Sequence, residues 1–500
     1  MAGNENTTPT EESTEQTTEN TSEEQEQEEA TVYTLYGANL FGRKEITTGV
    51  DAITRQNLVR VLGRALAIHH VNSQQIDYLY NYMKGKQPVL NRKKKIRPEI
   101  CNKIVENHAS EIVQFTSGYF LGEPVTYVRR GDRQNTSAEI NRLNDYMFYE
   151  DKASHDKDLA TWMAIGGVGY RMVLPDKKAG DLEDDSPFEM DTLDPRETFI
   201  VYSNQIGNKP LMAVKYCKDS DTQITTYSVY TENRYFLIED TIIKEDKPHA
   251  LGMIPIIEYP ANNARMGAFE VVLPLLDTMN LIASNRMDGI EQLVQAFIKF
   301  INCDISKEEY EEFLELGAIK VKSVDGQTAD VDTVVTELNQ TQTQTFKDDI
   351  YNAILTICGM PNRNGGTSTS DTGAAVLLRD GWSLAEARAK DSEHMFKLSE
   401  KQMLKLVLRI CRDMSDLKLR LKDIDMKFTR RNYENIQSKA QVLDLMLNNP
   451  KVHPLLAYEH SGMFTDPESA YMLSMKYYEE NKVEQSTTIE EQPEADTEEV

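Results

Sequence analysis

Two long helical patterns in the second half of the chain restrict the fold more than any other feature of the sequence. Apolar residues recur at helical spacing from Phe269 to Ile301 and again from Ala374 to Met414. As unbroken helices they would measure about 40 Å and about 60 Å. Polar residues interrupt the apolar side of the first, so we expect it in a soluble bundle or ring. No apolar stretch reaches about 18 residues, and we expect neither a signal peptide nor a membrane span.

A polar segment separates two of the expected helices. Residues 361–373 read Pro-Asn-Arg-Asn-Gly-Gly-Thr-Ser-Thr-Ser-Asp-Thr-Gly, which is too polar and too rich in glycine to pack against a core. Loops of this kind commonly cover catalytic sites, but the surrounding sequence supplies no nucleophile, general base or metal cluster. The segment therefore indicates contact with water or with a polar partner.

The negative charge of the chain is concentrated at its two ends. Of the formal net charge of −26, residues 1–29 contribute ten Glu and residues 484–500 contribute seven acids, with no Lys or Arg in either segment. The 454 residues between them carry only about −9. Tight DNA binding needs many Lys and Arg contacts to phosphates, so only weak contact with DNA is expected. Both ends lack the apolar residues that folding requires, and we expect both to be disordered.

Cysteine, histidine and glycine patterns give no sign of a disulfide, a metal or a bound nucleotide. The five cysteines are more than 40 residues apart, which fits neither a disulfide framework nor a zinc site and indicates a reducing compartment. His69 and His70 would diverge by about 100 degrees on a helix, so we expect surface or core histidines. Gly166-Gly167-Val168-Gly169 lacks the spacing and the Lys of a phosphate-binding loop. We expect no cofactor and no metal.

The middle of the chain is rich in strand patterns, so the expected fold class is α+β. Helical patterns at Arg55–Tyr82 and Glu99–Tyr119 come first, and one further helix is expected at Ser137–Ala164. Six segments with clustered or alternating β-branched and aromatic residues predict strands at 125–129, 170–174, 198–203, 211–216, 225–230 and 234–238. From residue 424 to residue 478 we expect helices, broken near prolines 450, 454 and 467.

A small unit is expected between the helix at 269–301 and a second helix at Thr341–Cys358. It begins with an acidic helix at Lys307–Leu316. A hairpin then pairs residues 318–321 with residues 331–335 across Asp325-Gly326. We predict that the chain runs outward along the first helix and returns along the second.

Two charged runs have both a plain and a functional interpretation. Arg92-Lys93-Lys94-Lys95-Ile96-Arg97 would most simply be a solvated turn between helices, although it could pair with an acidic surface of a neighbouring subunit. Asp181-Leu182-Glu183-Asp184-Asp185 lacks the spacing of a calcium loop, so we expect a solvated hairpin tip.

Five short sequence blocks are each weak evidence of a protein family, but their order and spacing make the combination specific. They are Gly118-Tyr119-Phe120-Leu121-Gly122-Glu123-Pro124-Val125-Thr126-Tyr127; Gly166-Gly167-Val168-Gly169-Tyr170 with Leu193-Asp194-Pro195; Ile254-Pro255-Ile256-Ile257-Glu258-Tyr259 with Asn262-Asn263; Leu276-Asp277-Thr278-Met279-Asn280 with Ser284; and Thr372-Gly373-Ala374-Ala375. In this combination the chain resembles the portal proteins of tailed double-stranded DNA phages of the siphovirus type.

The resemblance implies an α+β portal fold with an α/β wing, a helical stem, a small α/β clip and a helical crown, assembled as a ring. Applied to this chain it gives residues 1–31 as an acidic N-terminal tail, 32–268 as wing, 269–302 as first stem helix, 303–340 as clip, 341–360 as second stem helix, 361–373 as tunnel loop, 374–423 as long wing helix, 424–483 as crown and 484–500 as an acidic C-terminal tail. The long N-terminal extension and the Ser370-Asp371-Thr372-Gly373 end of the loop depart from the family pattern.

The resemblance also implies a structural protein that is not an enzyme. About twelve copies would form a head-to-tail ring at one capsid vertex of the virion, assembled in the host cytoplasm. DNA would be packaged and ejected through it without sequence specificity. Implied partners are the terminase packaging motor, neck adaptor proteins, the major capsid and scaffolding proteins and double-stranded DNA, with no membrane.

Two groups of residues would carry this function. The tunnel-loop residues expected along the DNA path are Asn362, Arg363, Asn364, Thr367, Ser368, Thr369 and Ser370. Neutral polar side chains with a single cation would touch a duplex without trapping its phosphates or reading its bases. In the clip, several acidic residues form either an ordinary solvent-exposed helix face or a docking surface for the packaging motor or a neck adaptor. These acids are Glu308, Glu309, Glu311, Glu312 and Glu315.

Two other classes of protein stay open. A DNA-packaging enzyme, such as a nuclease or an ATPase, would require a carboxylate cluster or a phosphate-binding loop, and the sequence supplies neither. A helical tail or scaffold protein would explain the acidic ends but not the strand-rich middle.

Overall fold

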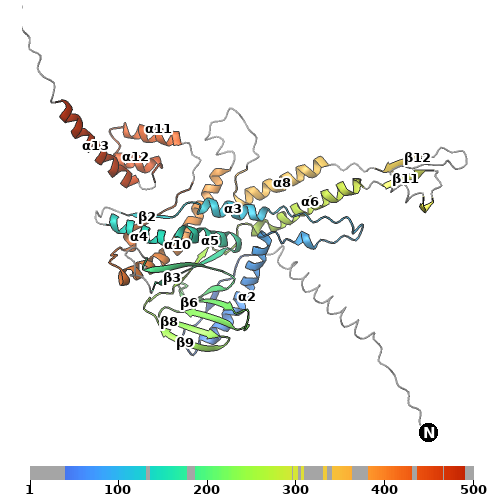
Figure 1. Cartoon of the computed structure of the whole chain (residues 1–500), viewed down its shortest axis with the longest axis horizontal. Helices are drawn as coiled ribbons and strands as arrows, with labels where there is room; N and C mark the ends of the chain where they lie inside the picture. The colour runs from blue at the N-terminus through green and yellow to red at the C-terminus, as the bar shows by residue number, and fades with distance from the viewer. Residues whose placement is uncertain are drawn as a thin grey trace, which may run out of the picture. The chain divides into compact units, whose positions relative to one another are not determined.

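The computed structural model describes residues 40–130, 136–176, 186–294, 297–301, 306–308, 330–334, 340–362, 381–430, 436–464 and 467–489. The chain divides into two compact units (Figure 1). The first comprises residues 1–41, 77–112 and 269–358, and the second comprises residues 42–76, 113–268 and 359–500. Helices α2 (Leu58–Met83) and α3 (His108–Phe120) each contribute residues to both units. None of the described helices combines the length and apolarity that crossing a bilayer requires.

The larger sheet of the second unit is an antiparallel meander with one parallel strand at its edge. Its order is β1 (Ile46–Thr48), β5 (Thr198–Ser203), β6 (Pro210–Lys218), β7 (Thr225–Tyr230), β8 (Arg234–Glu239) and β9 (Ile242–Pro248). Only the β1 to β5 pairing is parallel within this sheet. Alternate residues such as Phe199 and Val201 of β5 pack against Leu58 and Leu62 of α2. α2 therefore covers one face of the sheet.

A second, three-stranded sheet supports α5 (Lys152–Gly166) and α10 (Trp382–Met414). Its order is β10 (Ile256–Pro260), β3 (Val168–Pro175) and β4 (Phe188–Leu193). The close approach of α5 to β3 requires glycine, because a Cβ at Gly169 would lie 2.6 Å from Leu159 Cδ1. α10 buries Phe396, Leu404 and Val407 in the same core. That core is completed by α4 (Ser137–Tyr149) and by the strand pair β2 (Thr126–Arg129) and β13 (Ile424–Lys427).

Three further helices follow in the second unit. They are α11 (Ile436–Leu447), α12 (Pro454–Ser461) and α13 (Pro467–Ile489). Pro454 and Pro467 stand at the first helical positions, where a missing N–H costs no intrahelical hydrogen bond. α12 packs against both α11 and α13.

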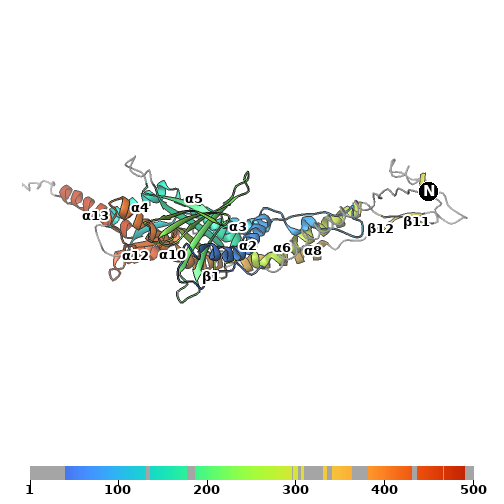
Figure 2. The same ribbon diagram turned by 90° about the horizontal axis from the view of Figure 1, so that it is seen from below.

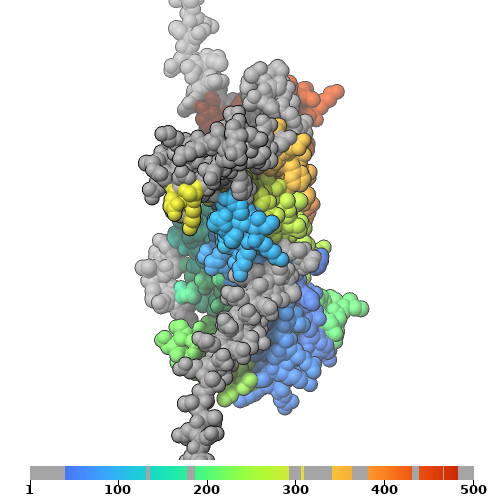
Figure 3. Space-filling view, turned by 90° about the vertical axis from the view of Figure 1, so that its right-hand side faces the viewer, coloured from blue at the N-terminus to red at the C-terminus, as the bar shows by residue number. Residues whose placement is uncertain are grey.

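The first unit is built on two helices that lie side by side, α6 (Leu273–Val294) and α8 (Gln340–Cys358) (Figures 1 and 2). Two short helices, η1 (Pro88–Asn91) and η2 (Glu270–Val272), contact α6. An antiparallel pair, β11 (Phe297–Ile301) with β12 (Asp330–Val334), lies between α6 and α8 in the sequence. Figure 3 shows the blue surface of the chain that follows η1 against the lime surface of α6.

Most of the predicted strands and helices are confirmed. β5 and β7 have the predicted bounds, and β2, β3, β6 and β8 differ from prediction by one or two residues at their ends. α8 begins one residue before the predicted helix. Strands β1, β4, β9 and β10 were not predicted.

Two helix predictions in the first half of the chain are wrong in extent. The helix predicted at Ser137–Ala164 is two helices, because Asp151 between them adopts the left-handed conformation at φ 45°. The helix predicted at Glu99–Tyr119 begins only at His108. Residues before it are extended because their amide groups bond to side chains of α6 rather than to each other.

The predictions around the small unit also need correction. The helix predicted at 269–301 ends at Val294, and Phe297–Ile301 is a strand that pairs with Asp330–Val334. The predicted partner strand, residues 318–321, lies outside the described residues, as do residues 309–316 of the predicted acidic helix and residues 181–185. Residues 424–427 form β13 rather than a helix, since they pair with β2.

The ends of the chain are only partly described. α13 continues to Ile489, so residues 484–489 are helical and not part of a disordered tail as predicted. Residues 1–31 and 490–500 lie outside the described residues.

Candidate functional site

The predicted channel and docking residues are only partly within the described structure. Asn362 is the last described residue before the polar segment and is half-buried, next to the buried Pro361. Glu308 is exposed at the start of a short helical segment. The other predicted residues, Arg363, Asn364, Thr367, Ser368, Thr369, Ser370, Glu309, Glu311, Glu312 and Glu315, lie outside the described residues. The described elements that precede and follow these residues therefore define the candidate site.

The last described residues before residues 363–380 lie close to the first described residue after them, and both belong to the second unit. A Cβ at Gly381 would lie 3.7 Å from both the Met360 carbonyl oxygen and the Pro361 Cα. Gly359 and Gly381 have φ values of 68° and 84°, which glycine adopts without strain. A side chain at Gly359 would also collide with Arg388, 2.3 Å from its Cδ. Both glycines therefore fix the points at which the polar segment departs and returns.

An extended strap, residues 101–107, is bound along α6 by a regular ladder of hydrogen bonds. The backbone N–H of Asn102 donates to Asp288 Oδ1 at 2.7 Å, that of Ile104 to Ser284 Oγ at 2.9 Å, and that of Glu106 to Asn280 Oδ1 at 2.8 Å. Two residues of extended chain advance about 6.6 Å and four residues of helix about 6.0 Å, so the two repeats nearly coincide. Three polar residues of α6, Asn280, Ser284 and Asp288, are therefore the binding positions for the backbone of this strap.

Part of the basic run at 92–97 is held against α6 by the same carboxylate. Asp288 accepts from Arg92 at 2.8 Å and from Lys94 at 3.0 Å, and its side chain is 4% exposed. Burial opposes its ionisation, but the Asn102 amide, Lys94 and Arg92 outweigh burial and lower the pKa of Asp288 to about 2. The prediction of a solvated turn is thus wrong for Arg92 and Lys94 and confirmed for the exposed Lys93 and Lys95.

α6 and α8 are joined by polar contacts in the first unit. Arg286 of α6 donates to Gln344 Oε1 of α8 at 2.7 Å. Lys347 of α8 forms an ion pair with Glu106 of the strap. The Tyr351 hydroxyl donates to Glu111 at 3.2 Å, and its ring lies 4.9 Å from that of His108. Both helices also bury apolar side chains, such as Met279 of α6 and Ile354 of α8. The polar contacts therefore add to apolar burial in the first unit.

A buried quartet of charged residues anchors α10 in the second unit. Lys152 Nζ lies 2.6 Å from Asp156 and 2.9 Å from Glu400, and Arg171 contacts the same two carboxylates. The hydroxyls of Tyr127 and Tyr259 donate to Glu400 at 2.5 Å and 2.7 Å. Burial would raise the pKa of Glu400, but Lys152 and Arg171 hold it below its usual value. The four charged side chains are at most 4% exposed.

This quartet was not predicted, although perturbed and clustered titratable groups are typical of catalytic sites. Its charges balance, every carboxylate is paired, and the core around it gives substrate no access. We therefore interpret it as structural. The signal in the sequence was weak: Arg171 stands within the strand pattern Tyr170 to Leu174, and Glu400 lies within a helical pattern.

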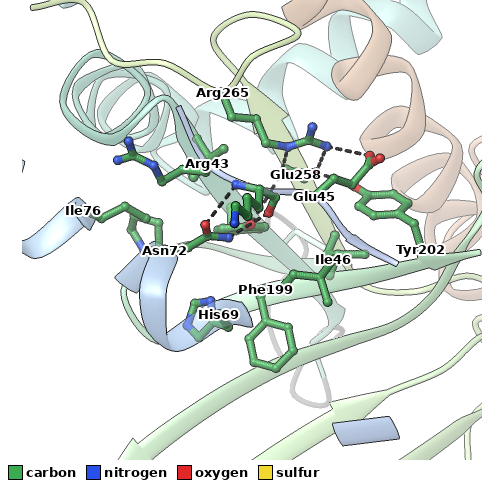
Figure 4. A pocket seen from close by; sticks show the side chains of 15 residues that line it. Arg43, Glu45, Ile46, His69, Asn72, Ile76, Phe199, Tyr202, Glu258 and Arg265 are labelled. Carbon is green, nitrogen blue, oxygen red and sulfur yellow. Dashed lines mark hydrogen bonds and ion pairs between the residues drawn. The ribbon is translucent and has the colours of Figure 1, made fainter. Parts of the chain in front are cut away.

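One cavity of the second unit that is lined by polar residues encloses very little space. Figure 4 shows Arg265 between Glu258 and Glu45, with nitrogen to oxygen distances of 2.9 Å to each. The cavity beside them measures about 20 Å³, which is room for roughly one water molecule and not for a nucleotide. His69 in its wall donates to the Arg196 carbonyl at 3.1 Å, and burial lowers its pKa to about 4. The prediction of a core histidine is thus confirmed for His69.

The described residues contain no group of three His, Cys, Asp or Glu side chains placed to hold a metal ion. Within this part of the chain, neither the quartet nor the cavity offers a nucleophile beside a general base in an open cleft. What the described residues do provide is a pair of braced helices, two neighbouring chain positions on either side of residues 363–380, and a long anchored helix.

Comparison with known proteins gives one family match. Residues 62–498 match the family described as "Phage portal protein, SPP1 Gp6-like". Among solved structures, the chain is similar to one titled "Neck of empty GTA particle computed with C6 symmetry", with 13% identity, a TM-score of 0.39, and coverage of 71% of this chain and 90% of that one. No curated protein matches the sequence.

Proposed function

Because the chain belongs to the family of SPP1 Gp6-like phage portal proteins, we propose that its copies close into a ring that gives double-stranded DNA a path through one capsid vertex. The family is one of structural proteins of the phage particle, and its match over residues 62–498 is the observation that carries the proposal. About twelve copies in head-to-tail contact would form the ring.

In this proposal α6 and α8 are the stem, and β11, β12 and residues 306–308 belong to the clip. The braced arrangement of α6 and α8 supports the first assignment, since a stem must keep its two helices in fixed register under load. α10 would be the long helix of the wing. α11, α12 and α13 would form the crown.

Residues 361–373 would be the tunnel loop that approaches passing DNA. Met360 and Pro361 lie close to Gly381, so residues 362–380, which include most of this loop, start and finish at neighbouring points. This supports the role, because such a segment can project without disturbing the elements that hold it. Arg363 would supply one cation per subunit. A ring of such cations can contact any phosphate and reads no sequence.

The clip acids would dock the terminase motor during packaging and the neck adaptors afterwards. Glu308 is exposed, as docking requires. Complementary charge would steer these partners into place and allow exchange between them. The alternative is that these acids form only a solvent-exposed helix face. Glu308→Lys separates the two interpretations, since only docking predicts that this charge reversal weakens binding of the motor.

Native mass spectrometry and end-on particle images of the full chain test the ring. We expect a closed oligomer with a central hole wide enough for a duplex, and a monomer would overturn the proposal. Arg363→Ala should then leave the ring intact while changing DNA retention or packaging. Lys476→Ala, at a side chain that is 78% exposed on α13, is the matched control and should change neither.

A further inference from the structure

The C-terminal half of α10 exposes four cations and, near its end, one acid, Asp413. Lys401, Lys405, Arg409 and Arg412 are exposed there and recur at three- to four-residue spacing, so they share one side of the helix. Residues 401–412 contain no Asp or Glu, although the whole chain carries −26. The opposite side of the helix is buried in the core. We call these four residues the basic face.

The cations of the basic face differ from those earlier in the same helix. Lys390 and Lys397 have carboxylates one turn before them, Glu386 at 3.7 Å and Glu393 at 3.6 Å. Among the described residues, no carboxylate forms an ion pair with any cation of the basic face. The helix dipole favours cations only in the last turn, so it accounts for Arg412 but not for Lys401 or Lys405.

A second exposed surface of the same unit combines acids with aromatic rings at the turn between α4 and α5. Phe148 is 81% exposed and Tyr149 is 54% exposed. Asp145, Asp151 and, on β4, Glu189 are exposed around them. We call these five residues the acidic aromatic face. Exposed clusters of large aromatic side chains commonly mark interaction sites.

Contacts between α4 and β4 place Glu189 beside this turn. Glu150 accepts a hydrogen bond from the Met190 N–H at 3.0 Å, and the Tyr146 and Phe188 rings meet edge to face at 6.5 Å. Arg142, one turn earlier on α4, is held over the Tyr146 ring at 5.4 Å. Asp145, Asp151 and Glu189 give this turn an acidic surface next to its exposed rings, although Arg142 is exposed nearby.

The two faces point away from a shared core. Leu143 and Met147 of α4 and Leu404 and Leu408 of α10 belong to one buried cluster, so the exposed sides of both helices face outward from it. Figure 2 shows α4 on the upper side of this unit and α10 on the lower side. Head-to-tail rings require two different and complementary surfaces on each subunit.

We propose that the basic face of one copy packs against the acidic aromatic face of the next copy and forms the contact that closes the ring. Lys and Arg would pair with Asp145, Asp151 and Glu189, and their positive ends would also lie over the rings of Phe148 and Tyr149. A second copy is the partner that these observations favour, because both halves of the contact are present on this chain. The inference rests on the proposed ring.

Charge reversal on each face gives a direct test with the full chain. One variant carries Lys401→Glu and Lys405→Glu, and the other carries Asp145→Lys and Glu189→Lys. Asp151 is kept because it holds the left-handed turn. Each variant alone would place like charges against each other, so we expect its ring fraction to fall at least about tenfold in native mass spectrometry. Mixed in equal amounts they should form rings in which the two variants alternate.

Lys390→Glu is the matched control, since Lys390 is exposed on the same helix but already paired within it. It should assemble like the wild type, and thermal unfolding should show all variants folded. Folded variants that assemble normally, or a mixture that does not recover rings, would overturn the inference. The inference would also be overturned if Lys401→Glu with Lys405→Glu abolished the binding of duplex DNA while the rings persisted. The basic face would then bind DNA phosphates instead of a neighbouring copy. A wild type without rings would instead overturn the proposed function.

Discussion

α6 and α10 are both held by polar side chains, but in opposite ways. On α6, Asn280, Ser284 and Asp288 each accept one backbone amide of the strap, so the restraint is spread over several turns. On α10, Glu400 alone gathers two cations and two tyrosine hydroxyls in a dry core. When one bond is removed from the strap, the other bonds along α6 remain and the loss of stability is smaller. When Glu400 is removed, two buried cations lose a partner and the loss is larger.

The largest effect is expected from Glu400→Gln. This change keeps the size of the side chain but leaves Lys152 and Arg171 with a single carboxylate, Asp156, in the core. We expect the free energy of unfolding to fall by about 3–5 kcal/mol. Urea denaturation measures it. Glu480→Gln is the control, because its side chain is 66% exposed and should change stability by less than about 0.5 kcal/mol. Equal losses for both variants would contradict a concentrated restraint.

A smaller loss is expected from Asp288→Asn. The amide can still accept from Asn102, but the charge that binds Arg92 and Lys94 is gone. We expect about 1.5–3 kcal/mol less stability. Hydrogen exchange of the strap amides should accelerate as well, while the exposed Asp349→Asn should leave exchange unchanged. Unaltered protection at Asn102 in Asp288→Asn would mean that the carboxylate does not hold the strap.

The same carboxylate predicts a specific acid dependence. The pKa of Asp288 is lowered from 3.8 to about 2, so its contribution is fully present above about pH 4 and is lost as the pH falls through 2. That contribution is about 2 kcal/mol. Stability measured against pH for the wild type and for Asp288→Asn should therefore converge near pH 2. A constant difference between pH 5 and pH 2 would exclude this shift.

The smallest change in stability is expected from Asp277→Asn, and this change is an increase. Burial raises the pKa of Asp277 to about 6, and the hydroxyl of Tyr82, which donates to it at 2.8 Å, only partly offsets burial. The folded protein therefore takes up a proton as the pH falls from about 7 to 4, and stability rises over that interval. Asp277→Asn should remove this rise and add about 1 kcal/mol at pH 7, allowing for partial solvent access. Retention of the rise in the variant would assign it to another group.

The sequence predicts β3 and the successive strands β5 to β8 because their alternation is a local property, but it misses β1, β4, β9 and β10. β5 and β7 follow directly from alternating β-branched and aromatic residues. The strap and β11 could not be predicted in this way, since both take their conformation from partners far along the chain. Phe297–Ile301 continues the apolar pattern of α6 and becomes a strand only because Asp330–Val334 pairs with it.

The functional residues were harder to predict than the fold. Lys152 and Asp156 look like an ordinary surface pair one turn apart, and only the positions of Arg171 and Glu400 in space show that they are buried. The basic run at 92–97 looks solvated because its partner, Asp288, lies nearly two hundred residues away. Of the predicted channel and docking residues, Asn362 and Glu308 are the two that fall within the described structure.

Met360 and Pro361 lie close to Gly381, and this affects how freely the length of the segment between them can vary. Because residues 363–380 begin and end at one place, insertions, deletions or exchange of the whole segment need not alter the helices on either side. Doubling the length of such a loop costs only about 0.6 kcal/mol in closure entropy. The length of this segment can therefore change at little cost to the folding of the elements on either side, and its limits would be set by the space in the proposed channel.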